Sequence, residues 1–415
     1  MNDLLKILMV CTEYPPMQGG VGRYTNNLVK SLRSNHLDVI VVSSSDGSGD
    51  YSGISPCNKQ NSEVLLKLVK KINPDIIHVQ HEFGLYGFFF DSLKPSKTST
   101  GLDKFYDECK TPIVTTFHTS MYFKQWMLLR NIKEKGNDKD YLRFYSLYKY
   151  WRHFINYSSM HRINKDLMSK SASGIVLSNY MRKLIPGTNV VYHGSVPYFQ
   201  TDKKRIEARK MMGLPEKGKL ALAQGFITNT KGWDIIRKLK MPKDWKLVVN
   251  YSKNFYNDEK IRFEYHDDKV INLDKRYLSE EELSLLFFSC DVIFLPYKVC
   301  SGSGIMFDGL GHGKPFVASD LGFFKEFSSK NLGIVAKRDP ILFEKAFEQI
   351  DKNYTYYKSN VEEFRKKISW DNIAKQHVSI YNNITTTTRN RLESISGEVI
   401  HAKRFHPTHK RSHNT

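Results

Sequence analysis

Leu5-Lys-Ile-Leu-Met-Val10 followed by Cys11-Thr-Glu-Tyr-Pro-Pro-Met-Gln-Gly-Gly-Val-Gly22 opens the regular part of this chain. The first six residues are mostly apolar, which predicts a buried strand, and three glycines lie in the loop that follows. From Gly22 to Leu32 the apolar residues have helical spacing, and 37–42 is again a short apolar run. A strand, a glycine-containing loop, a helix and a second strand in this order favour a parallel α/β sheet.

The same alternation continues along the chain. After a helix expected at 63–72, strands are expected at 75–79, 111–117 and 172–178. The pattern restarts after about residue 200, with further strands expected at 219–223, 245–250, 270–273, 292–295 and 315–318. The sequence therefore predicts two doubly wound α/β domains that face a central cleft. Ligands in such sheets bind beyond the carboxyl ends of the strands.

Composition limits the class of protein. The 415 residues are 40% hydrophobic and 26% charged, as expected for a folded chain of two domains. The net charge of +20 attracts anions such as nucleic acids, anionic lipids and nucleotide phosphates without choosing among them. Five cysteines without a C-x-x-C pair favour a reducing compartment and no structural zinc. No apolar run approaches ~20 residues, and the first residues do not resemble an export signal, so we expect a cytoplasmic protein.

Residues 121–170 differ from their surroundings, with 11 Lys/Arg against 4 Asp/Glu. Their aromatic and apolar residues recur at helical spacing at Tyr141, Phe144, Tyr145, Tyr148, Trp151 and Ile155. One interpretation is a helix stripe buried in the core. The other is a basic amphipathic helix that lies on an anionic membrane surface, which would place the protein at the inner face of the membrane.

The first candidate site is the loop Glu13-Tyr-Pro-Pro-Met-Gln-Gly-Gly-Val-Gly-Arg-Tyr24. Gly19 and Gly20 would let backbone N–H groups approach a phosphate closely, and the start of the following helix adds a favourable dipole. The spacing fits neither G-x-G-x-x-G nor a Walker loop. By the glycines alone, a tight turn without a ligand is an equally good interpretation.

This string resembles the opening loop of family 4 glycosyltransferases, which are retaining enzymes with the GT-B fold. Further stretches resemble the same family in the same order: 75–84, 115–118, 177–180, 193–194, 225–232, 290–297, 302–315 and 318–322. The resemblance covers residues 5–383. It implies transfer of a hexosyl group, with retention, from UDP- or GDP-hexose to a hydroxyl of a glycan or lipid-linked acceptor.

The resemblance also implies a domain organisation. An acceptor-side Rossmann-like domain is expected at 1–195, a nucleotide-sugar-binding domain at 196–370, and a helix at 371–384 that returns to the first domain. Residues 385–415 begin with four threonines and contain His401, His406, His409 and His413; we expect a mobile basic tail there and no metal site. No D-x-D pair follows a strand, since Asp267-Asp268 falls in a polar loop, so no metal is expected; no nucleic-acid-binding motif accompanies the charge.

On the donor side, the resemblance assigns Lys231 to the diphosphate, where its ammonium would stabilise the charge of the leaving phosphate. Phe226 and Thr228 stand where the family commonly has arginine, and Phe226 would line the donor site. The family also shows two glutamates eight residues apart, for which this chain has Cys300 and Asp308. Asp308 would accept hydrogen bonds from the ribose, whereas a thiol cannot replace a carboxylate.

Ser301-Gly-Ser-Gly304 resembles a Ser-x-Ser-Gly variant of the family. Ser301, Ser303 and the backbone amides of Gly304 and Ile305 would bind phosphate at the start of a helix. A plain helix N-cap is the alternative.

On the acceptor side, His118 would contact the donor sugar or the acceptor near the reacting carbon. His81 and Glu82 would orient acceptor hydroxyls, with Glu82 the better base, and Tyr14 and Arg23 would complete the acceptor site. Because Phe226, Thr228 and Cys300 depart from the family pattern, a non-catalytic or very slow nucleotide-sugar-binding protein is the alternative function.

Overall fold

The first half of the chain forms a six-stranded parallel sheet covered by helices. The computed structural model describes residues 4–87, 100–135, 147–197, 205–252, 268–273 and 277–404. The first sheet has the order β2-β1-β3-β4-β5-β6. Its strands are β1 (Lys6–Val10), β2 (Asp38–Val42), β3 (Ile76–His81), β4 (Ile113–Phe117), β5 (Ser173–Val176) and β6 (Asn189–Val190). Its helices are α1 (Gly20–Ser34), α2 (Asn61–Ile72), α3 (Phe83–Tyr86), α4 (Asp103–Glu108), α5 (Phe123–Lys135), α6 (Leu147–Lys170) and α7 (Asn179–Leu184).

The second half repeats this architecture with the order β12-β11-β10-β7-β8-β9, again parallel throughout. Its strands are β7 (Lys219–Phe226), β8 (Trp245–Ser252), β9 (Val270–Asn272), β10 (Val292–Leu295), β11 (Phe316–Ser319) and β12 (Gly333–Ala336). Its helical segments are α8 (Arg205–Met211), η2 (Asn229–Lys231), η3 (Trp233–Lys238), α9 (Glu280–Ser289), α10 (Gly304–Gly311), α11 (Gly322–Ser328), α12 (Pro340–Lys352) and α13 (Tyr354–Lys367). The predicted pair of doubly wound sheets is confirmed.

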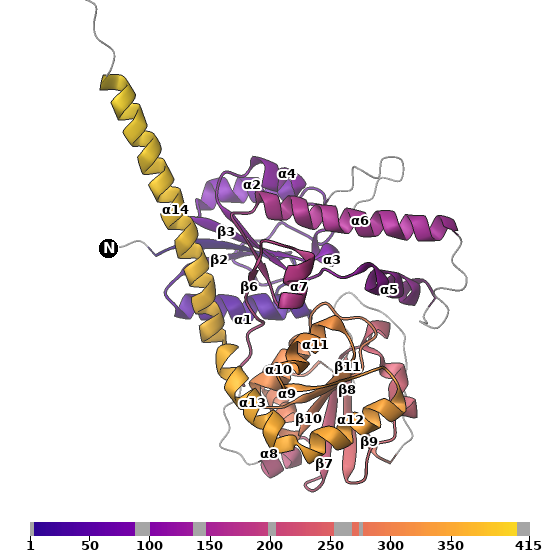
Figure 1. Ribbon diagram of the computed structural model, residues 1–415. Coiled ribbons are helices and arrows are strands. Elements are labelled where there is room, and N and C mark those ends of the chain that lie inside the picture. Colours follow the sequence, from indigo (N-terminus) through magenta and orange to yellow (C-terminus); the bar gives the residue numbers. More distant parts are fainter. Residues whose placement is uncertain are drawn as a thin grey trace, which may run out of the picture.

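The strands are apolar because helices cover both faces of each sheet. Ile7, Leu8, Met9 and Val10 of β1 are all fully buried. Figure 1 shows the first domain above the second, with the two sheets as separate layers. The loops that follow the strands of the two domains meet between the sheets, where the candidate site lies.

Helix α14 (Trp370–Arg404) leaves the second domain and runs along the first, where it packs against α1 (Figure 1). The structure differs from the predicted helix end at residue 384, because α14 continues to Arg404. The threonines suggested an irregular tail, but here they are part of the helix. The hydroxyls of Thr385, Thr387 and Thr388 donate hydrogen bonds to backbone carbonyls four residues earlier. The remaining tail, 405–415 with His406, His409 and His413, lies outside the described residues.

Helix α6 buries a different face from the predicted aromatic stripe. Its buried apolar side chains are Met160, Ile163 and Leu167, whereas Trp151 is exposed. The core interpretation is therefore wrong for Trp151. Tyr141, Phe144 and Tyr145, and the side chain of Tyr148, lie outside the described residues.

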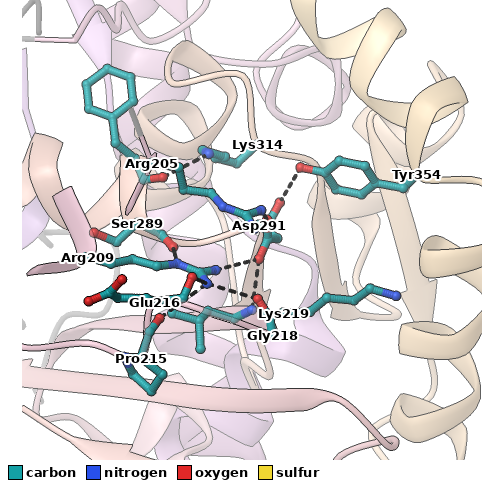
Figure 2. Close-up of polar contacts among 12 residues, drawn as sticks. Arg205, Arg209, Pro215, Glu216, Gly218, Lys219, Ser289, Asp291, Lys314 and Tyr354 are labelled. Carbon is teal, nitrogen blue, oxygen red and sulfur yellow. Dashed lines mark hydrogen bonds and ion pairs between the residues drawn. The ribbon is translucent and has the colours of Figure 1, made fainter. Parts of the chain in front are cut away.

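A buried ionic cluster fixes α8 to the second sheet (Figure 2). Asp291, which precedes β10, is buried and accepts from Arg205, from Arg209 Nη2 at 3.0 Å and from the backbone N–H of Leu220 at 2.9 Å. Arg209 is fully buried and also donates to the carbonyls of Pro215, Glu216, Gly218 and Ser289. Because one carboxylate joins α8, β7 and β10, this cluster holds the frame on which the second half of the site is built.

Candidate active site

A cavity of about 1170 Å³ lies between the two domains, and loops from both of them line it. The first domain contributes the glycine loop and the segments after β3 and β4, and the second contributes the ends of β7 and β8, the start of α9 and the start of α10. Within the described residues, no group of three His, Cys, Asp or Glu side chains could hold a metal ion. The predicted site residues that line this cavity are Gly19, Gly20, Arg23, Glu82, His118, Phe226, Lys231, Ser301, Ser303, Gly304 and Ile305.

The glycine loop packs around the carboxylate of Glu13, a residue for which the sequence predicted no role. Glu13 is buried, and its Oε1 accepts from the backbone N–H of Gly22 at 2.7 Å, in the first turn of α1. A Cβ placed on Gly19 would lie about 2 Å from the Glu13 carboxylate, so only glycine fits there. Burial raises the pKa of Glu13, and the nearby Glu82 raises it further, although the amide of Gly22 opposes this.

This arrangement changes the expected role of the loop. The carboxylate of Glu13 already takes the place at the start of α1 that a phosphate would occupy. A Cβ on Gly20, in contrast, would meet nothing within 4 Å, because Gly20 borders the open cavity. The glycine loop thus provides a close-packed wall for a ligand, while the prediction that Gly19 binds the diphosphate finds no support in its contacts.

The second domain supplies the positive wall of the cavity. Lys231 ends the short helix η2, and its Nζ lies 3.9 Å from the centroid of the Tyr297 ring. Gly232 follows with φ 73°, and a Cβ there would lie 1.9 Å from the carbonyl oxygen of Pro296, so the chain can turn at this point only with glycine. In the part of the chain that the structure describes, Lys231 has no carboxylate partner, so its charge is available to an anion.

The start of α10 lies beside this lysine. The Ser303 hydroxyl caps the helix by accepting from the backbone N–H of Met306 at 3.3 Å, and it lies 3.3 Å from the Tyr297 hydroxyl. Among the described residues the amides of Gly304 and Ile305 have no partner. Tyr297 therefore connects the lysine to a helix start whose first two residues line the cavity, which is a good environment for a phosphate.

The opposite wall carries His118 and Glu82. His118 follows β4, and its Nε2 lies 2.9 Å from Gln80 Oε1. Burial, together with His193 and His81, lowers the pKa of His118 to about 3, so the ring is neutral at physiological pH. Glu82 Oε1 accepts from the Thr119 hydroxyl at 3.2 Å, and Oε2 accepts from the backbone N–H of Gly84. A neutral hydrogen-bonding ring and a carboxylate thus face the positive wall across one cavity.

Comparison with known proteins shows similarity to glycosyltransferases. Residues 18–189 match Glycosyltransferase Family 4. An uncharacterized glycosyltransferase of Methanocaldococcus jannaschii is 23% identical over 91% of this chain and 98% of its own length. Sucrose-phosphate synthase of Thermosynechococcus elongatus has a similar structure, with a TM-score of 0.62 and 14% identity over 92% of this chain and 99% of that one. So does HepE of Anabaena in complex with UDP, with a TM-score of 0.61 and 13% identity over 91% of this chain and 100% of that one.

The protein is a glycosyltransferase of the GT-B type, in which residues 18–189 match family 4. Three of its predicted site residues lie away from the cavity wall. The Tyr14 hydroxyl is turned to Asn26 at 3.2 Å, and the His81 ring is packed among Phe83 and Tyr86 with its pKa lowered by burial to about 3. These contacts do not support the predicted acceptor roles of Tyr14 and His81.

The third of these residues is Asp308, whose carboxylate is fully buried and bridges the two domains of this glycosyltransferase. Arg23 Nη1, on α1, lies 2.5 Å from Asp308 Oδ2, and the Ser195 hydroxyl donates to Oδ1 at 3.3 Å. Burial alone would raise the pKa of Asp308, but the charge and hydrogen bond of Arg23 outweigh it and hold this pKa below its usual value. Arg23 and Asp308 thus form a contact between the domains, and Arg23 also borders the cavity. The ribose contact of Asp308 and the acceptor contact of Arg23 stay predictions.

The three residues that depart from the family pattern, Cys300, Phe226 and Thr228, contact other parts of the protein. Cys300 is buried, and burial raises the pKa of its thiol to about 12, so it stays neutral although Lys231 is near. Phe226 stacks on Tyr277 with the ring centroids 6.2 Å apart and an angle of 18° between the planes. Thr228 is hydrogen-bonded to Thr230.

Several residues of the glycosyltransferase site escaped the sequence analysis. Glu13, Gln80 and Tyr277 contact cavity residues, but their types are ordinary for a loop or a strand. The signal that could have found Glu13 is its position: it is the one carboxylate in the loop between the first strand and a glycine-rich helix start. Nothing comparable marks Gln80, because only the pairing of β3 with β4 brings it to His118.

Proposed function

We propose that this glycosyltransferase transfers a hexosyl group from UDP- or GDP-hexose to a hydroxyl of a glycan or lipid-linked acceptor, with retention and without a metal ion. The observation that carries the proposal is the single cavity that Lys231 and the first-turn amides of α10 share with His118 and Glu82. Its two walls match the two substrates, since one suits a phosphate and the other suits sugar hydroxyls. HepE, which has a similar structure, binds UDP.

Each wall has a role in the proposed transfer. The Lys231 ammonium and the amides of Gly304 and Ile305 compensate the charge that develops on the departing nucleotide diphosphate. Glu82 accepts the proton of the attacking acceptor hydroxyl. His118 orients a sugar hydroxyl near the reacting carbon, and Phe226 with Tyr277 supplies an aromatic surface for a ring of the donor.

The first experiment is a thermal-shift panel of nucleotide sugars with and without divalent metal, followed by transfer from radiolabelled donor to added acceptors. Ligand that binds the folded protein raises its melting temperature, so a shift with one donor names the base and sugar. An equal shift with and without metal supports metal-independent binding. No shift with any donor at millimolar concentration would count against the proposal.

The second experiment replaces Lys231 by Met. Loss of one group that stabilises the leaving charge typically lowers kcat about 10²–10³-fold, and we expect a loss of this size. Lys238→Met is the matched control, because Lys238 is an exposed lysine of the neighbouring helix η3. Equal activity of the two variants would remove Lys231 from the mechanism.

A non-catalytic nucleotide-sugar-binding protein is the alternative. The observation that favours it is the neutral, buried thiol of Cys300 where the family has a glutamate, together with the use of Asp308 to hold Arg23. This alternative predicts a thermal shift with a donor but no transfer, and a gain of turnover when Cys300→Glu and Phe226→Arg are combined. Brisk turnover by the unaltered protein would exclude it.

We also propose that the helices of the 121–170 segment contact an anionic membrane surface. Tyr122, Tyr150, Trp151 and Phe154 are 41–55% exposed, and exposed basic side chains of Lys124 and Arg152 lie among them in the sequence. Aromatic side chains with flanking cations are typical of interfacial helices. No helix in the described part of the chain is long and apolar enough to cross a membrane.

Vesicle sedimentation tests the membrane contact. We expect full-length protein to sediment with phosphatidylserine vesicles more than with phosphatidylcholine vesicles. The double variant Trp151→Ser and Phe154→Ser should lose most of this binding, while Tyr356→Ser, an exposed tyrosine of α13, should retain it. Equal binding by both variants would contradict the proposal.

A further inference from the structure

A chain of buried side chains connects helix α14 to the cavity wall. Tyr381 Oη, on α14, lies 2.6 Å from His78 Nδ1, and His78 Nε2 lies 3.2 Å from Gln80 Nε2 and 2.8 Å from the Thr116 hydroxyl. Gln80 Oε1 then lies 2.9 Å from His118 Nε2. Tyr381, His78 and Gln80 are fully buried. His78 and Gln80 share one face of β3 because they are two residues apart in a strand.

The direction of each hydrogen bond follows from the ends of this chain. The Gln80 amide nitrogen lies 3.3 Å from Met9 Sδ, which can only accept, so the Gln80 oxygen faces His118. His118 therefore donates from Nε2, and a neutral imidazole that donates from one nitrogen leaves a lone pair on the other. At the far end, the Gln80 amide nitrogen can only donate, so His78 Nε2 is an acceptor and the Thr116 hydroxyl also donates to it. His78 Nδ1 therefore carries the proton and donates to Tyr381 Oη.

We propose that Tyr381, His78 and Gln80 are positioning residues that hold His118 in the tautomer with its proton on Nε2. His118 Nδ1 is then the acceptor that the ring offers to a hydroxyl in the cavity. The assignment of His118 to a substrate hydroxyl rests on the proposed function, whereas the tautomer itself does not. Because Tyr381 belongs to the last helix, docking of α14 against the first domain determines which hydrogen bond His118 can make.

Nuclear magnetic resonance of the full-length protein with ¹⁵N-labelled histidine tests the tautomer directly. Long-range ¹H–¹⁵N correlations show which ring nitrogen carries the proton. We expect His118 to be protonated on Nε2 in the unaltered protein. Gln80→Met removes the acceptor with little change in size and should give a mixture of tautomers, whereas Gln80→Glu keeps an acceptor and should retain Nε2–H.

Tyr381→Phe tests the far end of the chain. Without the Tyr381 hydroxyl, His78 can place its proton on Nε2 and the Gln80 amide can rotate, so a second His118 tautomer should appear. Tyr106→Phe is the matched control: Tyr106 is also a buried tyrosine of the first domain, and its hydroxyl bonds Thr115 at 2.7 Å, outside this chain of contacts. Its tautomer spectrum should equal that of the unaltered protein.

Transfer rates provide the second measurement. Removing the groups that orient metal-binding histidines changes activity about 10- to 100-fold. By analogy we expect a loss of kcat of this order for Gln80→Met and a smaller one for Gln80→Glu. His118 in the same single tautomer in all variants would overturn the inference. Failure of the proposed function would look different, because the tautomer would shift as expected while the unaltered protein transferred no sugar.

Discussion

Removal of Arg23 offers a quantitative test of how the two domains are held together. The Asp308 side chain is 1% exposed and that of Arg23 is 18% exposed, so Arg23→Met leaves a buried carboxylate without its cation. Breaking a buried ion pair in this way typically costs about 3–5 kcal/mol. Because Arg23 retains some contact with solvent, we expect the lower end, about 3 kcal/mol of the free energy of unfolding.

The loss of stability caused by Arg23→Met depends on pH, and the direction of this dependence follows from the pKa of Asp308. In the unaltered protein the pKa of Asp308 lies below its ordinary value of 3.8, so the pair stabilises the protein fully above that value and loses its effect only as pH falls through the lower, folded-state pKa. Without Arg23, burial dominates and raises the pKa of Asp308. Once the pH falls below that raised pKa, the deficit of the variant should shrink by about 1.4 kcal/mol per pH unit.

Urea denaturation at pH 8 and at pH 5 measures both quantities. The control is Lys104→Met, because the Lys104 pair with Glu63 is 3.4 Å long and both side chains are more than half exposed; exposed pairs contribute about 0–1 kcal/mol. We expect a deficit near 3 kcal/mol at pH 8 that is smaller at pH 5 for Arg23→Met, and a small, constant change for the control. A deficit equal to that of the control at both values of pH would refute the reasoning.

Two further substitutions test the frame of the site. Gly19→Ala should lower the transfer rate sharply, because the added Cβ would meet the Glu13 carboxylate. Gly20→Ala should alter the rate little, because its Cβ would meet nothing within 4 Å. Equal kcat/KM values for the two variants would contradict this description of the packing. Asp291→Asn should lower the free energy of unfolding by about 3–5 kcal/mol, because it leaves Arg209 buried without a counter-charge, and urea denaturation would reveal a smaller loss if water can reach this cluster.

The fold could be predicted from sequence because its signal is local. Strands such as β1 and β10 are continuous apolar runs, and the helices between them carry their own periodicity. Two strands were missed: β6 has only two residues, and β12 begins with a glycine and is only partly buried at its last two residues, so neither shows a clear apolar run. The extent of α14 was missed for another reason: four successive threonines predict irregular structure, yet their hydroxyls bond back to the helix.

The site was predictable only in part, because its contacts join distant residues. The resemblance led to Lys231, His118 and the start of α10, which do line one cavity. It could not show that Arg23 and Asp308, 285 residues apart, would bond each other across the two domains. Nor could it show Tyr381 bonding His78 across 303 residues. Tertiary packing determines these partners, whereas a sequence pattern reflects only residues that are close to one another along the chain.

A second contact between the domains is also made by a carboxylate whose partner is distant in the sequence. Glu326 of α11 accepts from the backbone N–H groups of Asn179 at 3.0 Å and Tyr180 at 2.7 Å, at the start of α7 in the opposite domain. A carboxylate at a helix start is stabilising wherever it comes from, but in sequence Glu326 is one charge on a short helix. Together with Arg23 and Asp308, it fixes the second domain against the first. The cleft therefore depends on charges whose partners lie across it, and these were the residues that the sequence left without a role or assigned to the substrate.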